Sequence, residues 1–365
     1  MKVFLCCESL ESLTLPDSVN IIGTLAFGNC YDLEIVNFGI GVTNIEYAAF
    51  HGCESLKNIV IPNGVEIISE LAFGSCYNLE SVTIRGNIKK IEADAFSNCI
   101  NLTEVTIPKS LTYIGDSAFS GTRLKKVIIP ENVEYIGAGA FGSCLSLEEV
   151  IIYEKVEYIG DRAFYACFSL KEATIPQNVK YIGEKAFYGC LSLEKVTIKN
   201  PEINLYEENI FHTLFLLDGI QMSEFIKLYN EYHTYYILRD EEQAEVAWEK
   251  IEGHYIGLEN TIPLPILTMY GYEPSTAKVY AEENDIPFRV INGIDSSPTI
   301  PDDPVEPDTP DEPEAPDVPD ISDTPDDPCS CKCHGNFIQR LIFKITNFFQ
   351  KIFGQNKVCT CGVKH

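Results

Sequence analysis

A phenylalanine recurs at an almost fixed interval through the first half of this chain. The interval is 23 residues in every case but one, where it is 22, and the series is Phe4, Phe27, Phe50, Phe73, Phe96, Phe119, Phe141, Phe164 and Phe187. A fixed period of this length is typical of stacked supersecondary units, none of which buries its apolar face without its neighbours. The period therefore predicts a solenoid. It also points to a repetitive binding surface rather than a single catalytic cleft.

Each unit has the pattern of two short strands and a turn. Aligned on phenylalanine, it is Ala-Phe-x-x-Cys-x-x-Leu-x-x-Val-x-Ile-Pro-x-x-Val-x-x-Ile-Gly. In the eighth unit, the apolar and β-branched segment Leu170–Ile175 predicts a strand that Pro176 ends. Val179–Ile182 predicts a second extended piece, and Glu184–Cys190 is so short that we expect only a helical turn. Stacked copies would pair successive strands about 4.8 Å apart.

A cysteine follows the phenylalanine by three residues in all units but one, as Cys7, Cys30, Cys53, Cys76, Cys99, Cys144, Cys167 and Cys190. Thr122 takes this position in the unit that is one residue short. Stacked side chains that point the same way are poorly aimed for the disulfide dihedral. We therefore expect small, buried, free thiols that fill one interior position per unit, although disulfides are the alternative.

The repeat resembles the BspA-type leucine-rich repeat family of bacterial and protist surface proteins. The resemblance covers about residues 3–199 and rests on the signature Ile-Gly-x-x-Ala-Phe-x-x-Cys-x-x-Leu. It implies an exported, non-enzymatic protein used for adhesion or for display at the cell surface, built on a right-handed leucine-rich-repeat-like solenoid that we place at residues 1–199. The chain departs from the pattern where proline is usual, at Gly39, Arg85, Tyr153 and Lys199.

The chain begins inside a repeat. Phe4, Cys7 and Leu10 already fit the template, without a strand before them, and the apolar residues after Lys2 are too few for a signal peptide. We expect that the natural start, with an export signal, lies upstream, and that the protein is extracellular or on the cell surface.

Residues 200–297 predict a small α+β cap on the open end of the solenoid. A strand at 266–272, a capped helix from Ser275 and a strand at 286–291 make up this cap, and a similar segment commonly follows such repeats in the family. Residues 207–262 look like an insertion. Within it, Asp240–Gln243 is a capping box that predicts a helix.

Residues 298–328 predict a disordered linker. This segment carries 12 acidic residues and no basic ones, and its prolines recur every third residue from Pro298 to Pro319. Three residues per turn is the polyproline II period, so the segment would act as an extended spacer.

Residues 329–365 predict a separate tail, with an amphipathic helix over 337–353 between two clusters of cysteine and histidine. Four of seven residues could close a tetrahedral zinc site: Cys329, Cys331, Cys333, His334, Cys359, Cys361 and His365. A disulfide-clasped hairpin is the first alternative. The second is that the basic, aromatic-rich helix lies on a membrane or wall surface of the envelope. The tail is also similar to a C-terminal segment that recurs on surface proteins of gut Firmicutes.

Charge and motifs exclude several functions. The chain has a formal net charge of −27, so it would repel phosphate backbones, and we expect no nucleic-acid partner. The repeat region has isolated histidines and scattered acids, with no phosphate-binding or dinucleotide motif, so we expect no enzyme and no cofactor for the solenoid. An enzyme hidden in residues 200–297 is a remaining hypothesis.

One set of residues suggests a binding surface. In the second short strand, the residue before the isoleucine is a tyrosine in four consecutive units, at Tyr113, Tyr135, Tyr158 and Tyr181, whereas earlier units have Ile21, Asn44, Ile67 and Lys90. Stacked tyrosines would give a flat amphipathic strip for sugar rings or a protein partner. The alternative is that tyrosine simply suits an exposed strand.

We therefore predict a surface adhesion or recognition module whose partner is a protein or glycan of a host or neighbouring cell, held off the envelope by the linker and tail. The alternative is a structural display protein with no ligand of its own.

Overall fold

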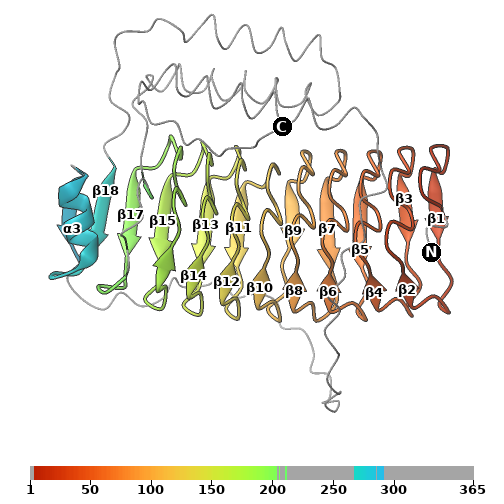
Figure 1. Cartoon of the computed structure of the whole chain (residues 1–365), viewed down its shortest axis with the longest axis horizontal. Coiled ribbons are helices and arrows are strands. Elements are labelled where there is room, and N and C mark those ends of the chain that lie inside the picture. Colours follow the sequence, from red (N-terminus) through yellow and green to blue (C-terminus); the bar gives the residue numbers. More distant parts are fainter. Residues whose placement is uncertain (1–3, 204, 206–209, 212–266, 285, 292–365) are drawn as a thin grey trace, which may run out of the picture. The chain divides into compact units, whose positions relative to one another are not determined.

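The computed structural model describes residues 4–203, 205, 210–211, 267–284 and 286–291. These residues belong to one compact unit, in which two sets of parallel strands stack along one axis (Figure 1). This confirms the predicted mainly β solenoid.

Each unit contributes one strand of three or four residues to what we call the longer sheet, because its strands are the longer ones. Its members are β1 (Ser12–Thr14), β3 (Ile35–Asn37), β5 (Asn58–Ile61), β7 (Ser81–Ile84), β9 (Glu104–Thr106), β11 (Lys126–Ile129), β13 (Glu149–Ile152), β15 (Glu172–Ile175) and β17 (Lys195–Ile198). Alternate residues are buried and exposed, as the period-2 pattern requires. Equivalent residues of successive units pair with each other, so Val127 pairs with Val150 and Ile129 with Ile152.

The second, two-residue strand of each unit belongs to an eight-stranded sheet, which we call the shorter sheet because its strands are the shorter ones. Its members are β2 (Ile21–Ile22), β4 (Asn44–Ile45), β6 (Ile67–Ile68), β8 (Lys90–Ile91), β10 (Tyr113–Ile114), β12 (Tyr135–Ile136), β14 (Tyr158–Ile159) and β16 (Tyr181–Ile182). In each of these two-residue strands the isoleucine is buried and the residue before it faces outward.

The turn that carries the phenylalanine differs from the predicted helical turn. Two residues of each turn have positive φ, one two positions before the phenylalanine and one two positions after it, as at Lys185 (57°) and Gly189 (76°). Alternating right- and left-handed residues cannot propagate a helix. Instead, alternate N–H groups reach the next unit, as where the N–H of Phe27 donates to the carbonyl of Ala49 at 2.8 Å.

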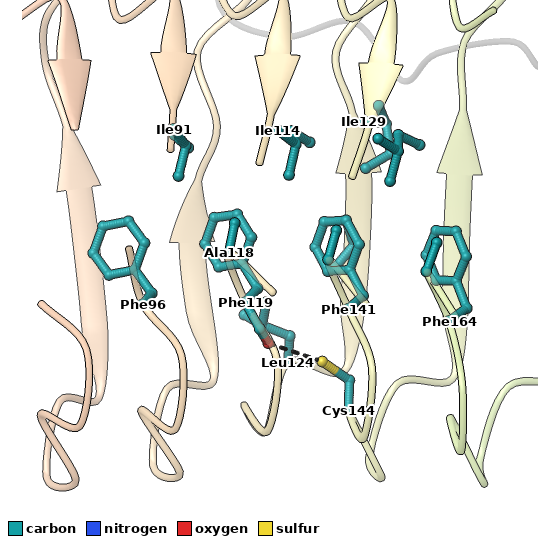
Figure 2. Packing of buried hydrophobic residues seen from close by; sticks show 14 of the residues in the cluster. Ile91, Phe96, Ile114, Ala118, Phe119, Leu124, Ile129, Phe141, Cys144 and Phe164 are labelled. Atoms are coloured by element: carbon teal, nitrogen blue, oxygen red, sulfur yellow. Dashed lines mark hydrogen bonds between the residues drawn. The ribbon is translucent and has the colours of Figure 1, made fainter. Parts of the chain in front are cut away.

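The phenylalanines form a continuous ladder in the core. Neighbouring rings lie nearly parallel with centroids 5.0–5.5 Å apart, and those of Phe96, Phe119, Phe141 and Phe164 are visible in Figure 2. All but the first are buried, and Phe4 is 44% exposed. The ladder extends further than the sequence predicts, because Phe211 stacks on Phe187 at 5.3 Å.

The interior cysteines are free thiols, as expected. From Cys30 onward, each thiol donates a hydrogen bond to the carbonyl of the preceding unit's phenylalanine, for example Cys76 to Phe50 at 3.2 Å. In the short unit, Thr122 takes the place of the cysteine, and its hydroxyl donates a hydrogen bond to the carbonyl of Phe119 in the same unit at 2.9 Å. That carbonyl also accepts the thiol of Cys144, drawn as a dashed line in Figure 2.

A seam interrupts the longer sheet at the short unit. The strands divide into a five-stranded sheet that ends at β9 and a six-stranded sheet that begins at β11. Val105 beside the seam is only partly buried, whereas the equivalent Val82 and Val127 are 2% exposed. Ile107 is also only partly buried, whereas the equivalent Ile84 and Ile129 are 7% and 0% exposed. The shorter sheet and the phenylalanine ladder continue past this point. The missing residue, between Thr122 and Leu124, therefore opens the stack on one side only.

The cap contains the predicted strand, helix and strand, and its two strands extend the second part of the longer sheet. β18 (Thr268–Gly271) pairs with β17, and β19 (Phe288–Val290) pairs with β18, both in parallel. Between them, α3 (Thr276–Glu283) begins at Ser275, whose side chain accepts a hydrogen bond from the N–H of Lys278. Tyr280 of this helix meets Phe211 edge-on at 6.0 Å and so closes the ladder. The predicted insertion, residues 207–262, lies almost entirely outside the described residues, as do the linker and the tail.

Candidate recognition surface

The four predicted tyrosines lie side by side on the outer face of the shorter sheet. We call Tyr113, Tyr135, Tyr158 and Tyr181 the tyrosine strip. The strand register places each one directly opposite the next. Ring centroids are 4.9, 4.8 and 4.8 Å apart, with interplanar angles of 5°, 5° and 13°. The spacing is that of parallel strands in a sheet, so the backbone register sets the position of the rings.

Glycine allows the close approach of units beneath the strip. In all four units the sequence is Tyr-Ile-Gly. A Cβ added to Gly137 would lie 2.5 Å from the backbone nitrogen of Asp116, and one added to Gly160 would lie 2.6 Å from that of Ala138. No side chain fits at such distances, so the glycines keep the four strands in tight register.

Mutual stacking decides which part of each ring a partner can reach. Tyr135 and Tyr158 have a neighbouring tyrosine against both faces. What these rings present outward is therefore edges and phenol oxygens. The inner two rings therefore have no open face on which a sugar ring could stack, and the predicted binding of sugar rings or a protein partner stays a prediction. At one end of the strip, the ammonium of Lys90 lies 6.0 Å from the ring centroid of Tyr113.

Carboxylates lie beside the strip. Asp116 accepts a hydrogen bond from the N–H of Ala138 at 2.8 Å, and Asp161 accepts one from the N–H of Glu184 at 3.0 Å. The hydroxyl of Tyr181 also donates to Asp161, at 3.4 Å. Each carboxylate is thus fixed by the backbone of the following unit.

These charges act on the tyrosines. Burial, followed by the charge of Asp116, raises the pKa of Tyr135 to about 12. Burial, Asp116 and Glu92 raise the pKa of Tyr113 in the same direction. Both phenols are therefore neutral hydrogen-bonding groups at physiological pH, in a region of negative potential.

A second tyrosine pair was missed at the sequence level. Tyr165 and Tyr188 directly follow their phenylalanines and stack with centroids 5.8 Å apart. Burial, with a smaller contribution from Tyr188, raises the pKa of Tyr165 to about 12. The signal was present in the sequence, since both residues occupy the same position in consecutive units.

The sequence of the repeat decides the family. The model for the BspA type leucine rich repeat region, in six copies, matches residues 1–125 and 112–236. The chain belongs to this family. Leucine-rich repeat solenoids of this kind are in general binding scaffolds without enzymatic activity, so the BspA-type repeat gives the chain a repeat-based binding or surface role.

Several solved structures resemble this BspA-type chain. A leucine rich cell surface protein from Faecalibacterium prausnitzii A2-165 is 23% identical, over 60% of this chain and 83% of that one, with a TM-score of 0.30. The pneumococcal vaccine antigen PcpA is 20% identical, over 78% and 80%, with a TM-score of 0.33. The leucine rich repeat protein of T. pallidum is 28% identical, over 53% and 69%, with a TM-score of 0.34. No curated protein matches the chain.

Metal and membrane sites are not found in the described part of the chain. No cluster of three or more histidine, cysteine or acidic residues there could hold a metal ion. No helix among the described residues is long and apolar enough to cross a bilayer. The seven candidate zinc ligands lie outside the described residues: Cys329, Cys331, Cys333, His334, Cys359, Cys361 and His365.

Proposed function

We propose that this protein is a non-enzymatic recognition protein of the cell surface, and that its solenoid binds a protein or glycan partner at the tyrosine strip. The acidic linker serves as a spacer, and the tail serves as an attachment or metal-binding module. The observation that carries the proposal is the strip itself. Four half-exposed aromatic side chains in strict register form an extended amphipathic row, and tyrosine is enriched where proteins recognise partners.

A display protein without a ligand is the competing function. Display needs a stable stack and a spacer, which the phenylalanine ladder and the linker provide. It does not need tyrosines in four consecutive units after units with isoleucine, asparagine and lysine at the same position. The change of residue type along one sheet position therefore favours recognition over display.

The test is binding of the full chain to an array of surface proteins and glycans. We compare the parent with the double variant Tyr135→Ser and Tyr158→Ser. The control is Ile21→Ser with Ile67→Ser, which removes exposed apolar side chains from the same strand position outside the strip; these isoleucines are 57% and 40% exposed. Circular dichroism checks that all three proteins fold alike.

The proposal predicts that the tyrosine variant loses the partners that the parent captures, while the isoleucine variant keeps them. A parent that captures no partner supports display. A tyrosine variant that retains every partner places recognition elsewhere on the molecule.

A further inference from the structure

We infer that the partner of the tyrosine strip is a basic, extended protein segment that lies along the stack. This inference rests on the proposed function and names the chemistry of its ligand. Three features of the strip carry it: the charges beside it, the state of its ring faces, and its length.

The charges beside the strip are unequally satisfied. Two nearby lysines already have acidic partners, since Lys180 pairs with Glu157 at 2.6 Å and Lys185 pairs with the adjacent Glu184. A third, Lys90, lies over the ring of Tyr113 at the end of the strip, with 6.0 Å from its ammonium to the ring centroid. Asp116 and Asp161 accept hydrogen bonds from backbone N–H groups and a phenol, and within the described ranges neither forms an ion pair. Two carboxylates beside the strip therefore remain available to lysine or arginine side chains.

The ring faces argue against carbohydrate. A neutral sugar ring gains most by stacking on an exposed aromatic face, and the inner tyrosines have both faces covered by their neighbours. Sulfated, sialylated or phosphate-bearing polymers would meet the negative potential of Asp116, Asp161 and Glu92 and be repelled. Phenol oxygens and carboxylates together instead offer acceptors for the N–H donors of lysine and arginine.

The length of the strip suits an extended peptide. The first and last rings are about 14 Å apart along the stack. An extended chain advances about 3.4 Å per residue, so about four residues span the strip. Side chains of an extended strand alternate in direction, so basic residues at every second position would all face the sheet, beside the carboxylates.

The experiment measures binding of the full chain to three immobilised eight-residue peptides: alternating lysine and serine, alternating glutamate and serine, and alternating glutamine and serine. A neutral chito-oligosaccharide and a sulfated heparin oligosaccharide are included as carbohydrate probes. The variant Asp116→Asn with Asp161→Asn removes two charges yet keeps an oxygen to accept the backbone N–H groups. The control, Glu148→Gln with Glu172→Gln, removes the same charge from exposed ion pairs elsewhere in the repeat.

We expect the lysine peptide to bind best, and its affinity to fall with added salt. The aspartate variant should lose about three- to ten-fold in affinity, as expected for the loss of two exposed ion pairs, and the glutamate control less than two-fold. Equal binding by the aspartate variant and the parent, or a preference for a glutamate, glutamine or sugar probe, overturns the inference.

Failure of this inference is distinguishable from failure of the proposed function. If the Tyr135→Ser and Tyr158→Ser variant loses a partner that is neutral or acidic, the strip binds as proposed and only the ligand chemistry is wrong. If that variant binds the lysine peptide as well as the parent does, the strip itself is not the binding site.

Discussion

At the scale of single residues, position in the stack decides how much a phenylalanine contributes. Phe164 is fully buried between Phe141 and Phe187, whereas Phe4 is 44% exposed and stacks on Phe27 alone among the described residues. Phe164→Ala should lower the free energy of unfolding by about 3–5 kcal/mol, because it removes a buried ring and leaves a cavity. Phe4→Ala should cost far less. Urea titration of both variants measures the difference, and equal losses would contradict nearest-neighbour stacking.

The buried repeat cysteines should make the protein less stable at alkaline pH. Burial raises the pKa of Cys144 to about 11 and that of Cys99 to about 12, from an ordinary value of 9.0. The thiols of the unfolded chain ionise at lower pH than those of the folded chain. Their contribution to the free energy of unfolding is therefore fully present below about pH 9, and it is lost as the pH rises through the pKa values of the folded state. Two pKa units correspond to about 2–3 kcal/mol for Cys144. The measurement is the urea midpoint at pH 8 and pH 10.5 for the parent and Cys144→Ala, and the variant should lose less between the two.

The residue-scale predictions from sequence succeeded where the repeat was regular. The phenylalanine core and the free thiols followed from periodicity alone, because stacking makes equivalent residues share one environment. Phe211 could not be found that way, since the spacing from Phe187 is 24 residues and the following cysteine is absent. The covered faces of Tyr135 and Tyr158 were equally hidden, because only the side-chain geometry shows how the rings overlap.

At the scale of secondary-structure elements, the seam between β9 and β11 should divide the solenoid into two cooperative segments. Unpaired strand edges and the partly exposed Val105 and Ile107 weaken the coupling of the two long sheets. Denaturant unfolding should therefore show two steps.

Repair of the short unit should remove the seam. Thr122→Cys with an asparagine inserted after Arg123 restores the Cys-x-Asn-Leu spacing of Cys99–Leu102. New ladder hydrogen bonds, at about 1 kcal/mol each, should merge the two steps and raise stability. The matched control inserts an asparagine after Asn101, in a unit of regular length, and should destabilise. A parent that unfolds in one step, unchanged by the repair, would show that the seam has no energetic effect.

Strands were predictable, and the turns were not. Apolar and β-branched residues before Pro176 predicted a strand over Leu170–Ile175, and the observed β15 begins two residues later and ends at the same residue. The turn at Glu184–Cys190 was expected to be helical because its length and composition suit one turn of helix. Stacking overrides this preference: positive φ at Lys185 and Gly189 turns alternate N–H groups toward the neighbouring unit. A single unit considered alone contains no information about that neighbour.

At the scale of the whole molecule, the tail remains the sharpest chemical prediction. We expect full-length protein purified under reducing conditions to hold about one zinc ion per chain, since four thiolate or imidazole ligands suffice. Elemental analysis measures it, and Cys331→Ser with Cys361→Ser should abolish the metal. The matched control is Cys53→Ser, which changes a buried repeat thiol and should leave the metal content unchanged. A metal-free parent whose tail cysteines form disulfides on oxidation would favour the clasped hairpin instead.

The central claim is that each unit is held in place by its neighbours in the stack. Hydrogen–deuterium exchange of the full chain, read by mass spectrometry, tests it most directly. We expect protection to rise from β1 toward β7, to fall at β9 and the start of β11, and to rise again through β17, where the cap covers the ladder. Uniform protection from β1 to β17, with a single exchange rate for the whole solenoid, would contradict this account.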